Sequence, residues 1–266
     1  MKLYVLGTGH ADVLKNYNNC FIIENDGKKM LVDAGGGNGV LAQMSKLNIS
    51  AKDLDCAFIS HNHSDHLLGF VWILRWGVLY PMLYKEEKDP FVLYGSNECL
   101  QAIDFLGKTT CGEKHWTKLK ENRLILKEVK DNQKEKIIGL DFEFFDTLAT
   151  DMPQMAFCIN NKDYVFTGDV PLNEKYYEKF TNKKYLCLEA FCTESDRVKN
   201  SLPLSKHKTS AECAKLAEKL KAKNLILWHG EDDIDGTRKE RYAEEAKKFY
   251  DGNIVVPNDL DTIVID

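Results

Sequence analysis

Hydrophobic and polar positions along the chain follow two periods, which together predict alternating strands and helices. Alternation with period two, or a short apolar run, predicts strands at residues 2–6, 20–24, 29–32, 54–60, 91–94, 137–148, 155–159, 164–167, 185–191, 225–228 and 261–265. Apolar residues spaced three or four apart predict helices at residues 38–47 and 98–106, from residue 67 onward, and after Thr209 and Thr237. Thr209 with Glu212 is predicted to form a capping box, and Thr237 with Glu240 to cap the later helix. Strands interleaved with helices are typical of an α/β protein.

Two stretches interrupt this pattern. Residues 108–136 are polar and rich in lysine, which predicts an exposed excursion. Residues 70–84 are unusually aromatic and could form core, the wall of a substrate pocket or a dimer surface, of which core is the most common fate of such side chains. Together they define a variable insertion around residues 70–136. No linker rich in proline, serine or glycine divides the chain, so we predict a single domain over residues 1–266.

Composition narrows the class of protein. The 266 residues carry a net charge of −5, which supplies no global electrostatic reason to bind nucleic acid. Eight scattered cysteines without a C-x-x-C motif are typical of buried thiols in a reducing cytoplasm. The longest apolar segment, residues 70–84, falls short of the roughly 20 residues that a membrane span requires.

The densest chemistry lies in the six residues from His61 to His66. This segment places His61, His63, Asp65 and His66 directly after the apolar run at residues 54–60. Imidazole and carboxylate are ligands that zinc and neighbouring transition metals prefer. In a turn that leaves a strand, two of the side chains can point one way and two another. Three of the seven histidines in one such window favour a metal site over a polar surface loop.

Other polar residues stand where predicted strands end. Asp33 precedes three glycines, Asp169 follows a strand and Gly168, and His229 follows the strand at residues 225–228. The early Gly7–Gly9 turn does not predict dinucleotide binding, because an aspartate occupies the place of the last glycine and no helical pattern follows. His10, next to that turn, could approach the site, but we interpret it as a loop histidine.

The H-x-H-x-D-H run, taken in order with Asp33, Asp169 and His229, resembles the signature of the metallo-β-lactamase superfamily. The resemblance implies a four-layer αββα sandwich within the α/β class and a metal-dependent hydrolase. It implies one or two divalent ions, zinc first with manganese and iron as alternatives, and a supporting role for Asp33. The metal ligands that it implies are His61, His63, Asp65, His66, Asp169 and His229.

Two further segments resemble motifs of the ribonuclease Z branch of that superfamily. They are Leu188-Glu189-Ala190-Phe191 and His207-Lys208-Thr209. The resemblance implies that His207 protonates the leaving oxygen and that Glu189 orients His207. In the mechanism that we predict, Asp65 orients the nucleophile while it ligates metal. Leu188 departs from the pattern, because the branch has a histidine there.

A second departure concerns the third histidine of the first metal site. Spacing to the segment that begins at Pro153 puts that ligand at Thr150, and threonine is not a usual ligand for these metals. Asp151 or Asp146 could substitute, or His61 and His63 could hold a weaker ion. The occupancy of the first site is therefore left open.

These observations predict a phosphodiesterase that uses metal-activated water on a small phosphodiester or nucleotide-type substrate. One alternative is an RNA-processing nuclease like ribonuclease Z, which the acidic balance and the absence of a long basic arm disfavour. The other is a metal-binding protein that has lost catalysis, which Thr150 and Leu188 motivate. We expect a small-molecule substrate, no membrane association and a cytoplasmic location, and we leave a homodimer open.

Overall fold

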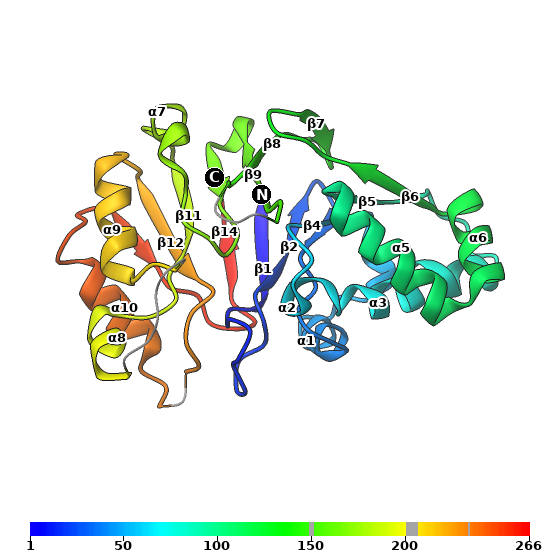
Figure 1. Cartoon of the computed structure of the whole chain (residues 1–266), viewed down its shortest axis with the longest axis horizontal. Coiled ribbons are helices and arrows are strands. Elements are labelled where there is room, and N and C mark those ends of the chain that lie inside the picture. Colours follow the sequence, from blue (N-terminus) through cyan, green and yellow to red (C-terminus); the bar gives the residue numbers. More distant parts are fainter. Residues whose placement is uncertain (149–151, 201–206, 234) are drawn as a thin grey trace. The chain divides into compact units, whose positions relative to one another are not determined.

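The computed structural model describes residues 1–148, 152–200, 207–233 and 235–266, and the chain divides into two compact units. Unit 1 comprises Met1–Gly7, Tyr17–Lys130 and Asp259–Asp266, and unit 2 comprises Thr8–Asn16 and Asp131–Asn258. Each unit contains one seven-stranded sheet with helices against it (Figure 1). A single domain over residues 1–266 stays a prediction.

The sheet of unit 1 has the strand order β14-β1-β2-β3-β4-β5-β6. Its strands are β1 (Lys2–Gly7), β2 (Cys20–Asn25), β3 (Lys28–Val32), β4 (Cys56–Ile59), β5 (Phe91–Gly95), β6 (Leu124–Glu128) and β14 (Thr262–Val264). Pairing is antiparallel from β14 to β3 and parallel from β3 to β6. Parallel neighbours need crossover connections, which helices supply here. They include α1 (Gly39–Lys46), η1 (Ala51–Asp53), α5 (Asn97–Cys111) and α6 (Glu113–Asn122).

A helical run directly follows the H-x-H-x-D-H segment. It consists of α2 (Ser64–Leu67), α3 (Phe70–Ile73), the π-helical segment η2 (Leu74–Leu79) and α4 (Tyr80–Leu83). Gly69 brings this run against the loop after β3: its N–H donates to the Gly35 carbonyl at 2.8 Å, and the Ala34 N–H donates to the His66 carbonyl at 2.8 Å. A Cβ on Gly69 would lie 1.9 Å from the Ala34 oxygen. The close approach therefore requires glycine.

Replacing Gly69 by alanine is expected to destabilise the protein by about 1–3 kcal/mol, because the added methyl group forces the helix away from a backbone oxygen. Gly37→Ala is the matched control, since a Cβ there meets nothing within 4 Å. Denaturant unfolding of both variants measures the difference. Equal stability of the two variants would show that the helix can move without cost.

The same helical run bears on two expectations. It spans 20 residues, Ser64–Leu83, and by length and composition it could cross a membrane, so the prediction that this region is too short was wrong. The helical run is longer than expected because it begins at Ser64, six residues before the aromatic segment at residues 70–84. Within the run, 56% of the most apolar window is buried, as in core helices. Trp72 and Trp76 are 38% and 45% exposed, so these two are not core residues.

Residues 108–136 are not an exposed excursion. They contain α6, β6 and part of β7 (Lys134–Ile137). Trp116 and Leu119 lie three residues apart on α6 and are buried, while the lysines around them face solvent. The prediction was wrong because two apolar positions in ten suffice to dock a helix when one of them is a tryptophan.

The sheet of unit 2 has the strand order β13-β12-β11-β10-β9-β8-β7. Besides β7, its strands are β8 (Leu140–Asp146), β9 (Met155–Ile159), β10 (Tyr164–Phe166), β11 (Tyr185–Glu189), β12 (Asn224–Trp228) and β13 (Asn253–Val255). Pairing is antiparallel from β7 to β10 and parallel from β10 to β13. The helices are η3 (Asn160–Lys162), η4 (Glu174–Tyr176), α7 (Tyr177–Phe180), α8 (Glu194–Asn200), α9 (Ser210–Lys219) and α10 (Arg238–Ala246). Helix α9 lies beside β11 and β12, and α10 lies beside α9 and β13 (Figure 1).

The two helix starts predicted in this unit behave differently. Thr209 and Glu212 form the predicted capping box of α9: the Glu212 N–H donates to the Thr209 hydroxyl at 3.2 Å, and the Thr209 N–H donates to the Glu212 carboxylate at 2.9 Å. Helix α10 begins after Thr237 as predicted, but the Thr237 side chain does not cap it. Its hydroxyl donates instead to Asp235 at 2.8 Å, so the predicted cap was wrong.

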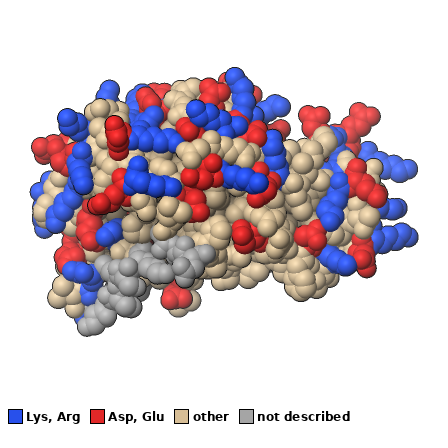
Figure 2. All heavy atoms as spheres, turned by 45° about the horizontal axis from the view of Figure 1, so that its top comes forward, with Lys and Arg blue, Asp and Glu red and all other residues tan. Residues whose placement is uncertain are grey.

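Charged side chains are intermixed on the face shown in Figure 2. Lysine and arginine side chains alternate with aspartate and glutamate across the part of the chain that is coloured there. This distribution agrees with the net charge of −5. On this face, the described residues form no extended basic surface of the kind that tracks a nucleic-acid backbone.

Candidate functional site

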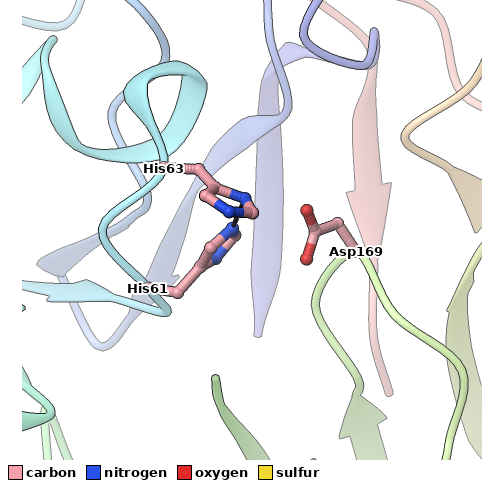
Figure 3. Close-up of side chains that lie close together, drawn as sticks. All are labelled: His61, His63 and Asp169. Atoms are coloured by element: carbon pink, nitrogen blue, oxygen red, sulfur yellow. Dashed lines mark hydrogen bonds between the residues drawn. The ribbon is translucent and has the colours of Figure 1, made fainter. Parts of the chain in front are cut away.

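The H-x-H-x-D-H segment of unit 1 gathers its side chains where β4 ends. The His61 Nε2 and His63 Nδ1 atoms lie 2.8 Å apart (Figure 3). The His61 ring centre lies 4.2 Å from that of His66, and the His66 Nε2 atom lies 3.1 Å from an Asp65 carboxylate oxygen. All but His63 are buried. The turn after a parallel strand therefore brings four candidate ligands of one unit together.

Asp33 supports two of these histidines. Its buried carboxylate accepts from the Ser60 N–H at 2.8 Å and the Ser60 hydroxyl at 2.8 Å, and lies 2.9 Å from the His66 Nδ1 atom. The Ser60 oxygen also lies 3.0 Å from the His61 Nδ1 atom. Engaging Nδ1 in both rings leaves Nε2 as the atom available to a metal. Asp33 has a φ of 54°, a strained conformation that this network holds in place.

Replacing Asp33 by asparagine is expected to weaken zinc affinity about 10- to 100-fold, because an amide holds the His66 ring less firmly than a carboxylate does. Competition with a chromophoric chelator measures the affinity. Asp26→Asn is the matched control, because Asp26 has a similar φ of 51° and is exposed. A loss of affinity in both variants would point to backbone strain as the cause.

Unit 2 carries candidate ligands at the ends of two parallel strands. Asp169 follows β10 through Gly168, whose φ of 75° favours glycine, and Asp169 is labelled in Figure 3. His229 follows β12 with a φ of 56°. Both side chains are buried, and the His229 Nε2 atom lies 3.8 Å from an Asp169 oxygen. The carboxyl ends of parallel strands meet at one edge of the sheet, which explains why they converge.

The predicted pair Glu189 and His207 also meets in unit 2. One Glu189 oxygen lies 2.8 Å from the His207 Nδ1 atom, and the other accepts from the Lys208 N–H at 3.2 Å. Glu189 is buried, whereas the His207 side chain is 32% exposed. Ligand atoms of Glu189, His207 and His229 all lie within 4.8 Å of one another. A buried carboxylate that orients an accessible imidazole suits proton transfer.

The sequence interpretation missed the loop that supports His229. The His10 N–H donates to the Gly230 carbonyl at 3.1 Å, and the Gly230 N–H donates to the Thr8 carbonyl at 2.9 Å. The His10 ring centre lies 4.6 Å from that of Phe191 and 6.4 Å from that of His229. His10 therefore belongs to the surroundings of the site and is not an isolated loop histidine. Its place after the Gly7–Gly9 turn had left this alternative open, but no local pattern favoured it.

Two residues of α10 hold the backbone around His229. The buried Arg238 guanidinium donates to the Thr8 hydroxyl at 2.7 Å and to the Glu231 carbonyl at 3.0 Å. The Tyr242 hydroxyl donates to the Phe191 carbonyl at 2.8 Å and accepts from the Glu231 N–H at 3.1 Å. These contacts stabilise the strained turn at His229. Arginine in an amphipathic helix predicts exposure, so the sequence offered no signal for this role.

Asp232 ties the same loop to the end of β12. Its carboxylate accepts from three successive N–H groups, at residues 14, 15 and 16. Burial acts to raise the pKa of Asp232, but these backbone N–H groups outweigh it and lower the pKa below its usual value. The carboxylate therefore stays ionised at neutral pH and keeps the loop in place.

The structure says little about the residues at, or proposed to replace, the missing third histidine ligand. Thr150 and Asp151 lie outside the described residues. Asp146 is the last residue of β8, and its carboxylate accepts from the Leu148 N–H at 2.9 Å. Its part in metal binding stays a prediction. The donor set that is described, imidazole nitrogens and carboxylate oxygens with firmly held partners, fits zinc, manganese or iron.

Comparison with known proteins identifies relatives of this chain. The family model described as "Anti-Pycsar protein Apyc1" matches residues 1–265. Anti-Pycsar protein Apyc1 of Saccharibacillus brassicae is 34% identical over 95 residues, which cover 35% of this chain and 36% of that protein. Ribonuclease Z of Methanococcus aeolicus is 34% identical over 105 residues, which cover 39% and 30%. The aligned stretches thus span about a third of these curated relatives.

Solved structures show the fold. The metallo-beta-lactamase fold protein YhfI from Bacillus subtilis superposes with a TM-score of 0.77 at 17% sequence identity, over 98% of both chains. The chain has the metallo-β-lactamase fold, which confirms the predicted α/β class. The similarity to ribonuclease Z of Methanococcus aeolicus agrees with the predicted resemblance to that branch. The substrate and the roles of individual residues remain predictions.

Proposed function

The chain belongs to the family of anti-Pycsar protein Apyc1, and from this premise we propose that it hydrolyses a small nucleotide-type phosphodiester, with a cyclic nucleotide as the specific candidate. The coarser class, a metal-dependent hydrolase of the phosphodiesterase type, already follows from the relatives. The proposal names the substrate class and the residues that act on it.

The observation that carries the proposal is the pair of Glu189 and His207. Cleavage of a phosphodiester expels an alkoxide, which needs a proton as it leaves. The 2.8 Å contact between Glu189 and the His207 Nδ1 atom directs the other ring nitrogen, Nε2, outward from a partly exposed side chain. A proton at that atom would reach the leaving oxygen. Hydrolysis of a lactam or thioester makes less use of such an acid.

We propose that the chain has a metal centre that holds one or two divalent ions, with zinc as the first choice. When bound, such ions supply Lewis acidity and lower the pKa of water to about 7. The residues we assign to it are those implied by the motif order: His61, His63, Asp65, His66, Asp169 and His229.

The remaining steps belong to side chains of this chain. Asp65 would accept a hydrogen bond from the attacking water and orient it toward phosphorus. His207 would give its Nε2 proton to the departing oxygen, and Glu189 would stabilise the imidazolium before the transfer and hold the neutral imidazole in place after it. The products would be a phosphomonoester and an alcohol, which for a cyclic nucleotide belong to one molecule.

The thiols of the chain support a cytoplasmic location. All eight cysteines are free, and seven of them are buried. Burial raises the pKa of Cys158 to about 11 and that of Cys192 to about 12, so both stay protonated and unreactive at neutral pH. A chain with this many unpaired cysteines fits a reducing compartment.

The deciding experiment assays the purified protein, after elemental analysis, on cyclic nucleotides, bis(4-nitrophenyl) phosphate and precursor tRNA. The proposal expects bound metal and turnover of the first two, with cyclic nucleotides preferred. Salt-sensitive binding and cleavage of tRNA would favour the ribonuclease alternative instead. Bound metal without turnover of any of them would favour a protein that has lost catalysis.

A further inference from the structure

A small cavity lies in unit 2 beside the Glu189–His207 pair. It has a volume of about 140 Å³ and opens between the end of β11 and the start of α9. Its walls are mainly apolar, formed by Val170, Leu172, Leu188 and Leu216 with the Tyr177 ring. A cavity of about 150 Å³ with such walls is large enough to bind benzene. This one therefore has room for a single six-membered ring.

The cavity borders directly on the proposed catalytic residues. Val170 follows Asp169 in the chain, Lys208 follows His207, and Glu189 both contacts His207 and lines the cavity. A group joined to the reacting phosphate by a few bonds would therefore reach it. The base of a nucleotide is such a group.

Its polar rim suits the edge of a heterocyclic base. The Lys208 ammonium donates to a Glu212 carboxylate oxygen at 3.4 Å, and the two side chains are 43% and 40% exposed. They present a hydrogen-bond donor next to an acceptor. A base edge carries the complementary pair, whereas the apolar walls suit the faces of its ring.

Leu188 links the cavity to the departure from the ribonuclease Z pattern. It stands where that branch has a histidine, and here it is buried and forms part of the apolar wall. A histidine would make this wall polar. Leu188, which suggested lost catalysis when compared with the ribonuclease Z pattern, therefore has another explanation: it gives the cavity an apolar wall that suits a ring.

We propose that this cavity binds the base ring of the substrate, an inference that rests on the proposed nucleotide substrate. Lys208 and Glu212 hydrogen bond to the edge of the ring, and Leu188 and Leu216 contact its faces. The cavity has room for one ring, which suits the single base of a small nucleotide.

The test fills the cavity from one side. Leu216→Phe adds volume inside it, and Leu106→Phe on α5, also partly buried, is the matched control. Each protein is assayed on a cyclic nucleotide and on ribose 3′,5′-cyclic phosphate, which has no base. We expect Leu216→Phe to lower the ratio of kcat/KM on the cyclic nucleotide to kcat/KM on the ribose phosphate about 10- to 100-fold, because the base ring can no longer be buried. The control should leave this ratio unchanged.

Binding of a free nucleoside, measured by calorimetry, separates this inference from the proposed function. Wild-type protein should bind the nucleoside and Leu216→Phe should not, even if no diester is hydrolysed. If Leu216→Phe fails to fold, Lys208→Met at the exposed rim replaces it and should weaken nucleoside binding. An unchanged substrate ratio, or nucleoside binding that neither variant alters, would overturn the inference.

Discussion

Replacing His207 by alanine is expected to lower kcat on a cyclic nucleotide about 10²- to 10⁴-fold, because the departing alkoxide loses its proton donor. KM should change little, since the proposed metal ligands are untouched. The loss should be smaller on bis(4-nitrophenyl) phosphate, whose leaving group is stable as an anion. Steady-state kinetics on the two substrates measures both effects.

The control for this variant is His115→Ala. His115 is exposed on α6, in the other unit, and should leave both rates unchanged. Glu189→Gln should resemble His207→Ala in direction, because an amide oxygen holds the imidazolium less strongly. Equal losses on both substrates would assign His207 to a role other than proton donation.

Replacing His66 by asparagine is expected to remove at least one metal ion per chain and nearly all activity. The asparagine amide can take over the donation to Asp33 that the His66 Nδ1 atom makes at 2.9 Å, but nothing replaces Nε2. The activity loss should exceed the about 10- to 100-fold cost of removing a ligand's hydrogen-bond partner. Elemental analysis of freshly purified protein counts the ions.

Wild-type protein stripped by a chelator is the reference for that variant. Activity should return to the wild type when zinc or manganese is added back, and it should not return to His66→Asn at the same metal concentration. A similar melting temperature of the two metal-free proteins would show that the fold survives. Full metal content in the variant would exclude His66 from the ligands.

Local patterns predicted most elements where one period dominates. The run at residues 185–191 became β11, and the capping box at Thr209 marked the start of α9. Prediction failed where tertiary contacts decide whether a side chain is buried or exposed. Trp116 packs a lysine-rich helix that sequence alone assigned to solvent. Trp72 and Trp76 lie partly exposed although aromatic residues usually enter the core.

The candidate site divides in the same way. Its candidate metal-binding segment is dense enough to be found without a structure, because four potential donors lie within six residues. Ser60 was overlooked, since a serine before a histidine has no distinctive spacing. Arg238 was overlooked because its partner Thr8 is 230 residues away in the chain.

The amino-acid sequence by itself determined the chemistry of this protein: which donors exist, in what order, and at the ends of which strands. Tertiary structure alone decided which of these donors are held rigidly, that the loop at residues 8–16 supports His229, and that a ring-sized cavity adjoins Glu189. The reason is the separation along the chain over which each kind of interaction acts. Periodicity and turn chemistry act between near neighbours, whereas burial and hydrogen bonding join residues whose separation in the chain follows no rule.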